Sequence, residues 1–146
     1  MNIKKLIISI LIPVAVGTVI GLITMPFNDY KDLIQPPLAP PSIAFPIVWT
    51  ILYILMGISA YMVSESGGKL DTYYLQLFVN ALWSIIFFIF KLKLLAFIWI
   101  LLLIYLVIKM IREFLSTYRP AGLLQIPYLL WLVFAAYLNL GVYILN

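Results

Sequence analysis

The sequence predicts an all-α integral membrane protein, a bundle of five transmembrane helices with a long proline-rich first loop. Of the 146 residues, 66% are hydrophobic and only 10% charged, and the mean hydropathy is +1.17, which excludes a water-soluble domain. Five apolar runs each approach the roughly 20 residues that a helix needs to cross a bilayer. Backbone groups in lipid must bond within their own segment, and the runs lack the alternation of barrel strands. A single membrane domain over 1–146 would then have spans at 6–26, 44–64, 71–90, 94–115 and 122–145.

The first run follows Lys4 and Lys5, so a cleaved signal peptide is the alternative to a retained helix. The run is too long for a signal peptide, and no convincing A-x-A cleavage site follows it. We therefore expect a retained helix. Gly17 and Gly21 form a G-x-x-x-G motif, which permits close helix approach. We expect this motif to pack inside the monomer rather than to form a dimer seam.

The longest connector, residues 27–43, is the first loop. Its four prolines fix φ and push the residues before them into extended geometry, which predicts a semi-rigid lid with room for one short helical turn. These prolines are Pro36, Pro37, Pro40 and Pro41. The other connectors are short, so neighbouring helices are expected to run antiparallel.

The basic residues predict the orientation of the chain. Six of them lie on the side of the N-terminus and three on the side of the first loop. The positive-inside rule then places the N-terminus in the cytoplasm, with the first loop and the C-terminus outside. The basic residues are scattered singly or in pairs, so the net charge of +4 does not indicate nucleic-acid binding.

Several kinds of chemistry are excluded by composition. The chain contains no His and no Cys, which removes thiolate chemistry, imidazole acid or base catalysis and the usual ligands of metals and haem. We expect neither a metal nor a cofactor. All five carboxylates lie in or beside connectors, so a proton-coupled pump is not expected.

The third run carries a polar stripe, because Gln76, Asn80 and Ser84 recur every four residues and share one helical face. Interhelical hydrogen bonding and pocket lining both explain such a stripe, and both can hold at once.

Two further runs carry aromatic residues at helical spacing. Trp49 and Tyr53 share a face of the second run, and the fifth run carries Pro127 and Trp131. We expect Pro127 to bend that helix. Measured from the side of the first loop, Trp49 lies roughly 8 Å deep, Asn80 roughly 15 Å and Trp131 roughly 20 Å, so the three are placed to line one descending cavity. Tryptophan is enriched at the two membrane–water interfaces, which explains in part the positions of Trp49 and Trp83. We assign Trp99 to packing or to lipid contact.

Four stretches of the sequence combine prolines, aromatic residues and amides at fixed spacings. They are Pro36-Pro37-Leu38-Ala39-Pro40-Pro41, Phe45-Pro46-x-Val48-Trp49-Thr50-x-Leu52-Tyr53-x-Leu55-Met56-Gly57, Asn80-x-x-Trp83-Ser84-x-x-Phe87-Phe88 and Pro127-Tyr128-x-x-Trp131-x-x-Phe134-Ala135-x-x-Leu138-Asn139. Together they resemble the TspO/MBR family of tryptophan-rich sensory and translocator proteins, and the resemblance covers nearly the whole chain.

The resemblance implies a pocket closed by the first loop that accepts porphyrins, sterol-like lipids and benzodiazepine-type ligands, commonly in a homodimer, here in a bacterial cytoplasmic membrane. It also implies light-dependent degradation of protoporphyrin IX, with Trp49 and Trp131 in the catalytic positions. By motif position the pocket residues would be Phe45, Trp49, Tyr53, Asn80, Phe87, Trp131 and Ala135, and Pro41, Ser84, Tyr128 and Leu138 complete the candidate set.

Two departures from the family pattern weaken parts of this expectation. Leu38 occupies a position where many relatives have Trp, which removes one stacking surface from the first loop. Leu140 and Ile144 replace the aromatic and basic residues of the cholesterol motif of animal relatives, so sterol recognition through that motif is unsupported.

The sequence favours ligand binding over catalysis, because the expected cavity offers no acid, base or metal site. A carrier for porphyrins, sterols or other lipids is the first alternative, although no inverted repeat is visible. A scaffold without a ligand is the second. Lys31, Lys91 and Lys93 could meet the propionates of a porphyrin at the rim, and headgroup contact is the competing role.

Overall fold

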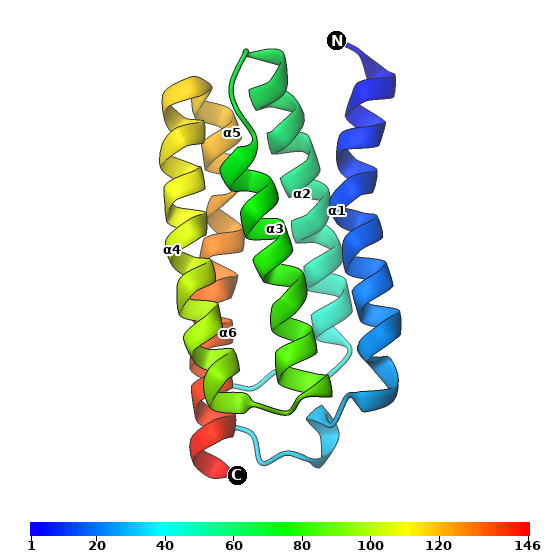
Figure 1. Cartoon of the computed structure of the whole chain (residues 1–146), viewed down its shortest axis with the longest axis vertical. Coiled ribbons are helices and arrows are strands. Elements are labelled where there is room, and N and C mark those ends of the chain that lie inside the picture. The colour runs from blue at the N-terminus through cyan, green and yellow to red at the C-terminus, as the bar shows by residue number, and fades with distance from the viewer.

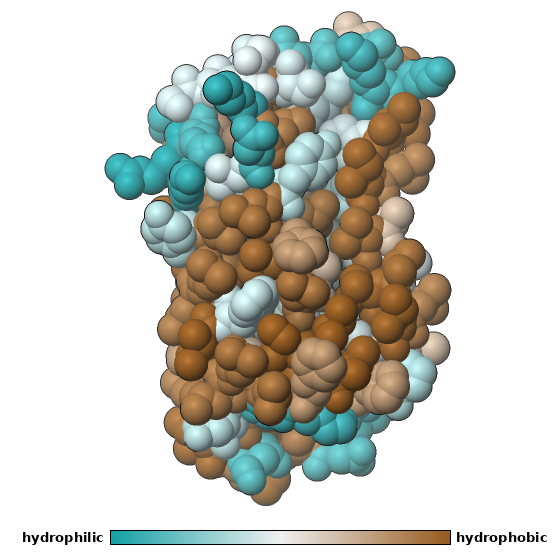
Figure 2. Space-filling model, in the orientation of Figure 1, coloured by the Kyte–Doolittle hydropathy of each residue, from teal (hydrophilic) through white to brown (hydrophobic).

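The computed structural model describes residues 1–146 and contains helices and loops only. Five helical segments are long and apolar enough to cross a membrane, and they run as an antiparallel bundle with the two termini at opposite ends (Figure 1). On the face shown in Figure 2, residues of high hydropathy form a broad band across the bundle, and hydrophilic residues gather at its two ends. The five-helix membrane bundle with its long first loop is therefore confirmed. Its helices are α1 (Ile3–Thr24), α2 (Ala44–Glu65), α3 (Asp71–Ser84), α4 (Lys93–Thr117), α5 (Arg119–Leu124) and α6 (Ile126–Leu145).

The core of the bundle lies between α2, α3, α4 and α6, where Met56, Val107 and Leu132 are completely buried. In α1, by contrast, only two residues are buried, Pro13 and Thr24. Because α1 contributes so little to the core, it is held at the edge of the bundle, chiefly by its extensive contact with α2.

Glycines permit these close contacts between α1 and α2. A Cβ on Gly57 would overlap the Cα of Ile10 and come within 2.7 Å of the carbonyl oxygen of Ser9. The Ser9 hydroxyl donates to the carbonyl oxygen of Gly57 at 2.7 Å. A Cβ on Gly17 would overlap the Tyr53 ring, whereas one on Gly21 would meet no atom within 4 Å. The close approach at Gly17 is therefore made inside the monomer, as expected.

Two of the predicted spans are interrupted. The third continues from α3 into a π-helical turn, Ile85–Ile89, a feature that is frequent at functional sites. The fifth is divided into α5 and α6 at Gln125. The expectation of one bent helix through Pro127 is wrong, because α6 begins just before Pro127. Proline is tolerated in the first turn of a helix, where its missing N–H has no partner to lose.

The first loop crosses the end of the bundle where the C-terminus lies (Figure 1). It contains one short 3₁₀ turn, Tyr30–Asp32, as the sequence predicted, and a second 3₁₀ turn, Met25–Phe27, ends the first span. The Tyr137 hydroxyl donates to the carbonyl oxygen of Pro37 at 2.6 Å. The Asn146 side chain receives the N–H of Ile34 at 3.0 Å and donates to its carbonyl oxygen at 2.9 Å. The first loop is therefore held by hydrogen bonds to Tyr137 of α6 and to Asn146, the residue that follows α6.

Candidate ligand-binding site

A cavity of about 500 Å³ lies beneath the first loop, in the half of the bundle that this loop covers. Its wall is formed by α1, α2, α3, the π-helical turn, α4, α6 and the start of the first loop, and most of the lining residues are hydrophobic. This volume is typical of pockets for small organic molecules, which measure about 300–1,000 Å³. The cavity can therefore hold a ligand of the size of a drug or a cofactor.

The structure brings most of the candidate residues to this wall. Nine of the eleven line the cavity: Phe45, Trp49, Tyr53, Asn80, Ser84, Phe87, Trp131, Ala135 and Leu138. The other two do not. Pro41 is exposed on the first loop, and Tyr128 is only 1% exposed and lies behind the wall, where its hydroxyl binds other side chains.

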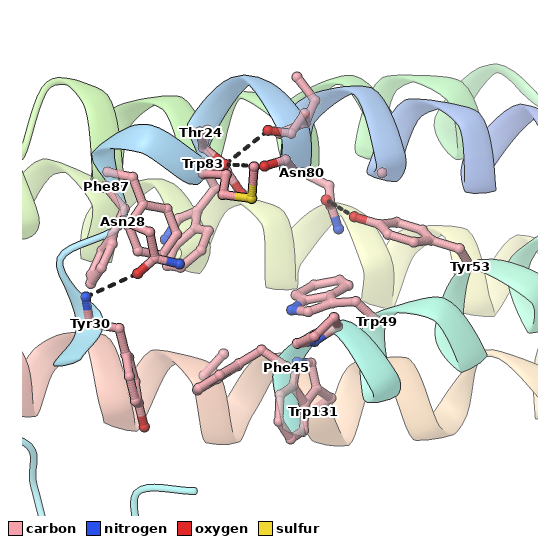
Figure 3. Close-up of a pocket in the computed structure, with 18 of the residues that line it drawn as sticks. Thr24, Asn28, Tyr30, Phe45, Trp49, Tyr53, Asn80, Trp83, Phe87 and Trp131 are labelled. Atoms are coloured by element: carbon pink, nitrogen blue, oxygen red, sulfur yellow. Dashed lines mark hydrogen bonds between the residues drawn. The ribbon is translucent and has the colours of Figure 1, made fainter. Parts of the chain in front are cut away.

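Aromatic rings form two groups across the cavity (Figure 3). On one side the Trp49 and Tyr53 rings stack at 5.5 Å, and the Phe45 ring meets the Trp131 ring edge to face at 5.9 Å. On the other side Trp83 stacks on Phe87 at 4.9 Å. Rings on both sides of an apolar space favour a flat, aromatic ligand, because offset stacking and edge contacts add to the burial of its faces.

A chain of hydrogen bonds leads from the wall into the bundle. The Tyr53 hydroxyl donates to Asn80 Oδ1 at 3.1 Å, and Asn80 Nδ2 donates to the Tyr128 hydroxyl at 2.7 Å. That hydroxyl donates in turn to Gln76 Oε1 at 2.7 Å. The polar stripe of the third span therefore serves both purposes that the sequence left open, since Asn80 and Ser84 line the cavity while Gln76 and Asn80 bond to other helices.

The indole N–H groups of three tryptophans, Trp83, Trp99 and Trp131, differ in their hydrogen-bond partners. Trp83 Nε1 donates to Asn139 Oδ1 at 3.0 Å, so this residue faces the interior and is not part of an interfacial belt. Trp99 Nε1 donates to the carbonyl oxygen of Val79 at 2.8 Å, which confirms packing for Trp99. Trp131 lines the cavity with its ring, whereas its Nε1 is buried and has no hydrogen-bond partner in the protein.

Sequence reasoning missed part of the wall. Thr24, Asn28 and Tyr30 line the cavity from the end of α1 and the start of the first loop. The Tyr30 ring meets Phe45 edge to face at 4.9 Å, and its hydroxyl donates to the carbonyl oxygen of Pro40. Burial raises the pKa of the Tyr30 phenol above its ordinary value, so the phenol keeps its proton and this bond further into the alkaline range. No motif marked these residues, because they reach the cavity only when the chain turns back under itself.

An ionic cluster joins the first loop to the start of α4. Asp29 lies 3.2 Å from Lys93 Nζ and 3.4 Å from Lys91 Nζ. Lys93 Nζ also donates to the carbonyl oxygen of Phe87 at 3.0 Å and lies 3.7 Å from the centre of the Phe87 ring. Both lysines therefore have a partner within the protein, a role that the sequence did not suggest. The cluster links the first loop to Phe87 on the wall.

We expect Asp29→Asn to loosen the first loop. The substitution removes the negative charge that faces Lys93, whose side chain is only 12% exposed. A loss of about 1 kcal/mol, the upper end for partly exposed pairs, corresponds to roughly five-fold faster ligand release. Stopped-flow dissociation and amide exchange over residues 28–42 measure the effect. Asp32→Asn is the matched control, because Asp32 is exposed on the same loop and forms no ion pair. Equal release rates in the two variants would contradict this role for Asp29.

Comparison with known proteins identifies the family. The model of the TspO/MBR family matches residues 9–145. The chain is 37% identical to the Tryptophan-rich protein TspO of Archaeoglobus fulgidus, with 100% of this chain and 99% of that protein covered. It is 34% identical to the Translocator protein homolog of Schizosaccharomyces pombe, with 93% and 88% covered. It is also 34% identical to the Translocator protein of Ovis aries, with 77% and 72% covered. The chain therefore belongs to the TspO/MBR family of integral membrane proteins, with a receptor-like or transporter-like role in the membrane.

Proposed function

We propose that this protein binds tetrapyrroles such as protoporphyrin IX, and other flat hydrophobic molecules, in the cavity beneath the first loop. The observation that carries the proposal is an apolar space of about 500 Å³ with aromatic rings on two sides. A macrocycle would bury its faces against the rings of Trp49 and Phe87.

Binding is favoured over catalysis as the primary function. The residues that line the cavity include no carboxylate, imidazole or thiol, and the phenols of Tyr30 and Tyr53 already donate to protein groups, so the wall supplies no free group for general acid or base chemistry. Light-dependent oxidation of a bound porphyrin by oxygen would instead involve the indoles of Trp49 and Trp131, as the resemblance to the family implies. The two activities are separable by experiment.

Tryptophan fluorescence in lipid nanodiscs tests the binding proposal. We expect saturable quenching by protoporphyrin IX in the dark, and at least ten-fold weaker affinity after Trp131→Ala, because the loss of a large aromatic ring from the wall corresponds to about 1.4 kcal/mol or more. Trp99→Phe is the matched control, since Trp99 packs in the core and does not line the cavity. Absence of saturable quenching would favour a scaffold without a ligand.

Porphyrin absorbance followed under light and in darkness tests the catalytic part. If the two indoles take part in oxidation, Trp49→Phe and Trp131→Phe each slow the light-dependent loss of absorbance at saturating porphyrin. An unchanged rate in both variants would exclude catalysis by these residues and leave the binding proposal intact.

A carrier for porphyrins, sterols or other lipids is the second candidate, and one observation favours it. Gly21 and Leu22 of α1 and Thr50 of α2 line the cavity and are also exposed on the outside of the bundle. The cavity therefore reaches the surface that faces lipid. Saturable porphyrin flux into vesicles would support a carrier over a receptor. The homodimer, the bacterial cytoplasmic membrane and the cytoplasmic N-terminus stay predictions of the sequence.

A further inference from the structure

A second polar region lies deeper in the bundle, on the side away from the first loop. Tyr73 and Gln76 of α3 and Gln125 at the junction of α5 and α6 are each no more than 1% exposed. They are separated from the ligand cavity by Tyr128, and none of the three lines that cavity. The ligand-binding proposal does not account for them.

Four polar atoms of these side chains are buried without a hydrogen-bond partner in the protein. They are the Tyr73 hydroxyl, Gln76 Nε2 and both polar atoms of the Gln125 carboxamide. Buried polar groups are almost always paired, and lipid offers them no alternative partner. Gln125 is the strongest case, because its whole carboxamide is enclosed and neither its donor nor its acceptor is used.

The spacing along the helices places Tyr73 and Gln125 one turn from Gln76 and Tyr128, which bond to each other across the bundle. Tyr73 and Gln76 are three residues apart on α3, and Gln125 and Tyr128 are three residues apart at the start of α6, so each pair shares a helical face. The N–H of Leu129 donates to the carbonyl oxygen of Gln125 at 3.2 Å, which keeps this turn helical. Tyr128 donates to Gln76 at 2.7 Å, so the two faces are turned toward each other.

We propose that Tyr73, Gln76 and Gln125 enclose an internal site that binds water. The chemistry of the group selects a small neutral molecule, because the three side chains offer two amide donors, one amide acceptor and a hydroxyl, and no formal charge. Water both donates and accepts, and a buried water typically makes about three hydrogen bonds to groups of this kind. The site continues the chain of Gln76, Tyr128 and Asn80, so bound water would help to orient Asn80 on the cavity wall.

Unfolding of the ligand-free protein gives the first test. Gln125→Met and Tyr73→Phe keep the size of each side chain and remove only groups that have no partner in the protein. If water is bound there, each variant lowers Tm by about 2–4 °C, and the double variant loses less than the sum because the two groups share a ligand. If the site is dry, both variants leave Tm unchanged or raise it, and the proposal is overturned.

Two further variants calibrate this measurement. Tyr128→Phe removes direct bonds to Gln76 and Asn80, so its Tm falls whether or not water is present. Tyr143→Phe removes an exposed hydroxyl, so its Tm stays constant.

Transfer of magnetisation from water to side-chain amides gives the second test, by solid-state NMR in deuterated lipid. We expect a water cross-peak to the Gln125 side-chain amide that disappears in Gln125→Met, with the exposed Asn28 amide as a reference. Absence of the Gln125 cross-peak overturns the proposal even if Tm falls. Both tests are made without a ligand, so their failure leaves porphyrin binding untouched.

Discussion

Gly57→Ala is expected to destabilise the protein by about 1–3 kcal/mol, the cost of inserting a methyl group into a packed interior. The new Cβ would overlap the Cα of Ile10 and lie 2.7 Å from the carbonyl oxygen of Ser9. Both atoms belong to the backbone of α1, so no side-chain rotation relieves the contact and the two helices must separate. Alanine is favoured over glycine in a helix by about 1 kcal/mol, which offsets part of the packing cost, and the backbone overlap places that cost at the upper end of its range, so the net loss is about 2 kcal/mol.

Gly21→Ala is the matched control on the partner helix. The same methyl group on Gly21 would meet no atom within 4 Å, so only the gain in helix propensity remains and stability should be unchanged or higher. Thermal unfolding in detergent, followed by circular dichroism, compares the two variants. Equal stabilities would show that the α1–α2 contact near Gly57 relaxes without cost, and that α1 is held by lipid rather than by α2.

Asn80→Leu should disturb both the stability of the bundle and the binding of a ligand. Leucine has a similar size but cannot accept from Tyr53 or donate to Tyr128. Tyr53 lies on the cavity wall and can turn its hydroxyl toward a ligand or water, whereas Tyr128 is buried. The Tyr128 hydroxyl keeps its bond to Gln76, so we expect a loss of about 0.5–1.5 kcal/mol, the usual net contribution of a hydrogen bond. Porphyrin affinity should fall as well, because Tyr53 stacks on Trp49.

Ser84→Ala is the control for this variant. Ser84 lines the cavity on the same face of α3, one turn from Asn80, and its hydroxyl bonds to no protein group. Its removal should change stability by less than about 0.5 kcal/mol, as for substitutions that break no such feature. Thermal unfolding and fluorescence titration on both variants measure the difference. If Asn80→Leu is as stable as Ser84→Ala, the hydrogen-bond chain contributes nothing to the fold.

The helices of this protein were predictable because lipid leaves the backbone few options. An apolar run of about 20 residues must form a helix, and short connectors force the next helix to return. The breaks inside the spans were harder to predict. Pro127 marked the region where the fifth span is interrupted, but the local hydrogen bonds decided that α5 ends at Leu124 and that α6 begins at Ile126. No residue pattern indicated the π-helical turn after Ser84.

The candidate site was predictable where its residues share the face of one helix. The spacing of Asn80 and Ser84 on α3 gave their common face directly, and the resemblance to the family supplied positions on other helices. Tyr128 illustrates the limit of this reasoning. It belongs to a family motif and lies close to the cavity, yet packing turned its hydroxyl to Gln76 and placed it behind the wall.

Hydrophobicity and periodicity determined by themselves that the chain spans a membrane as five helices, because these properties act within one segment at a time. The tertiary structure alone decided which polar groups face a ligand, a neighbouring helix or an internal site. That choice depends on the rotation and close approach of helices, which glycines such as Gly17 and Gly57 permit and which the position of the first loop completes. It also left Trp131 Nε1 without a partner beside the cavity, a consequence of packing between segments that no single segment encodes.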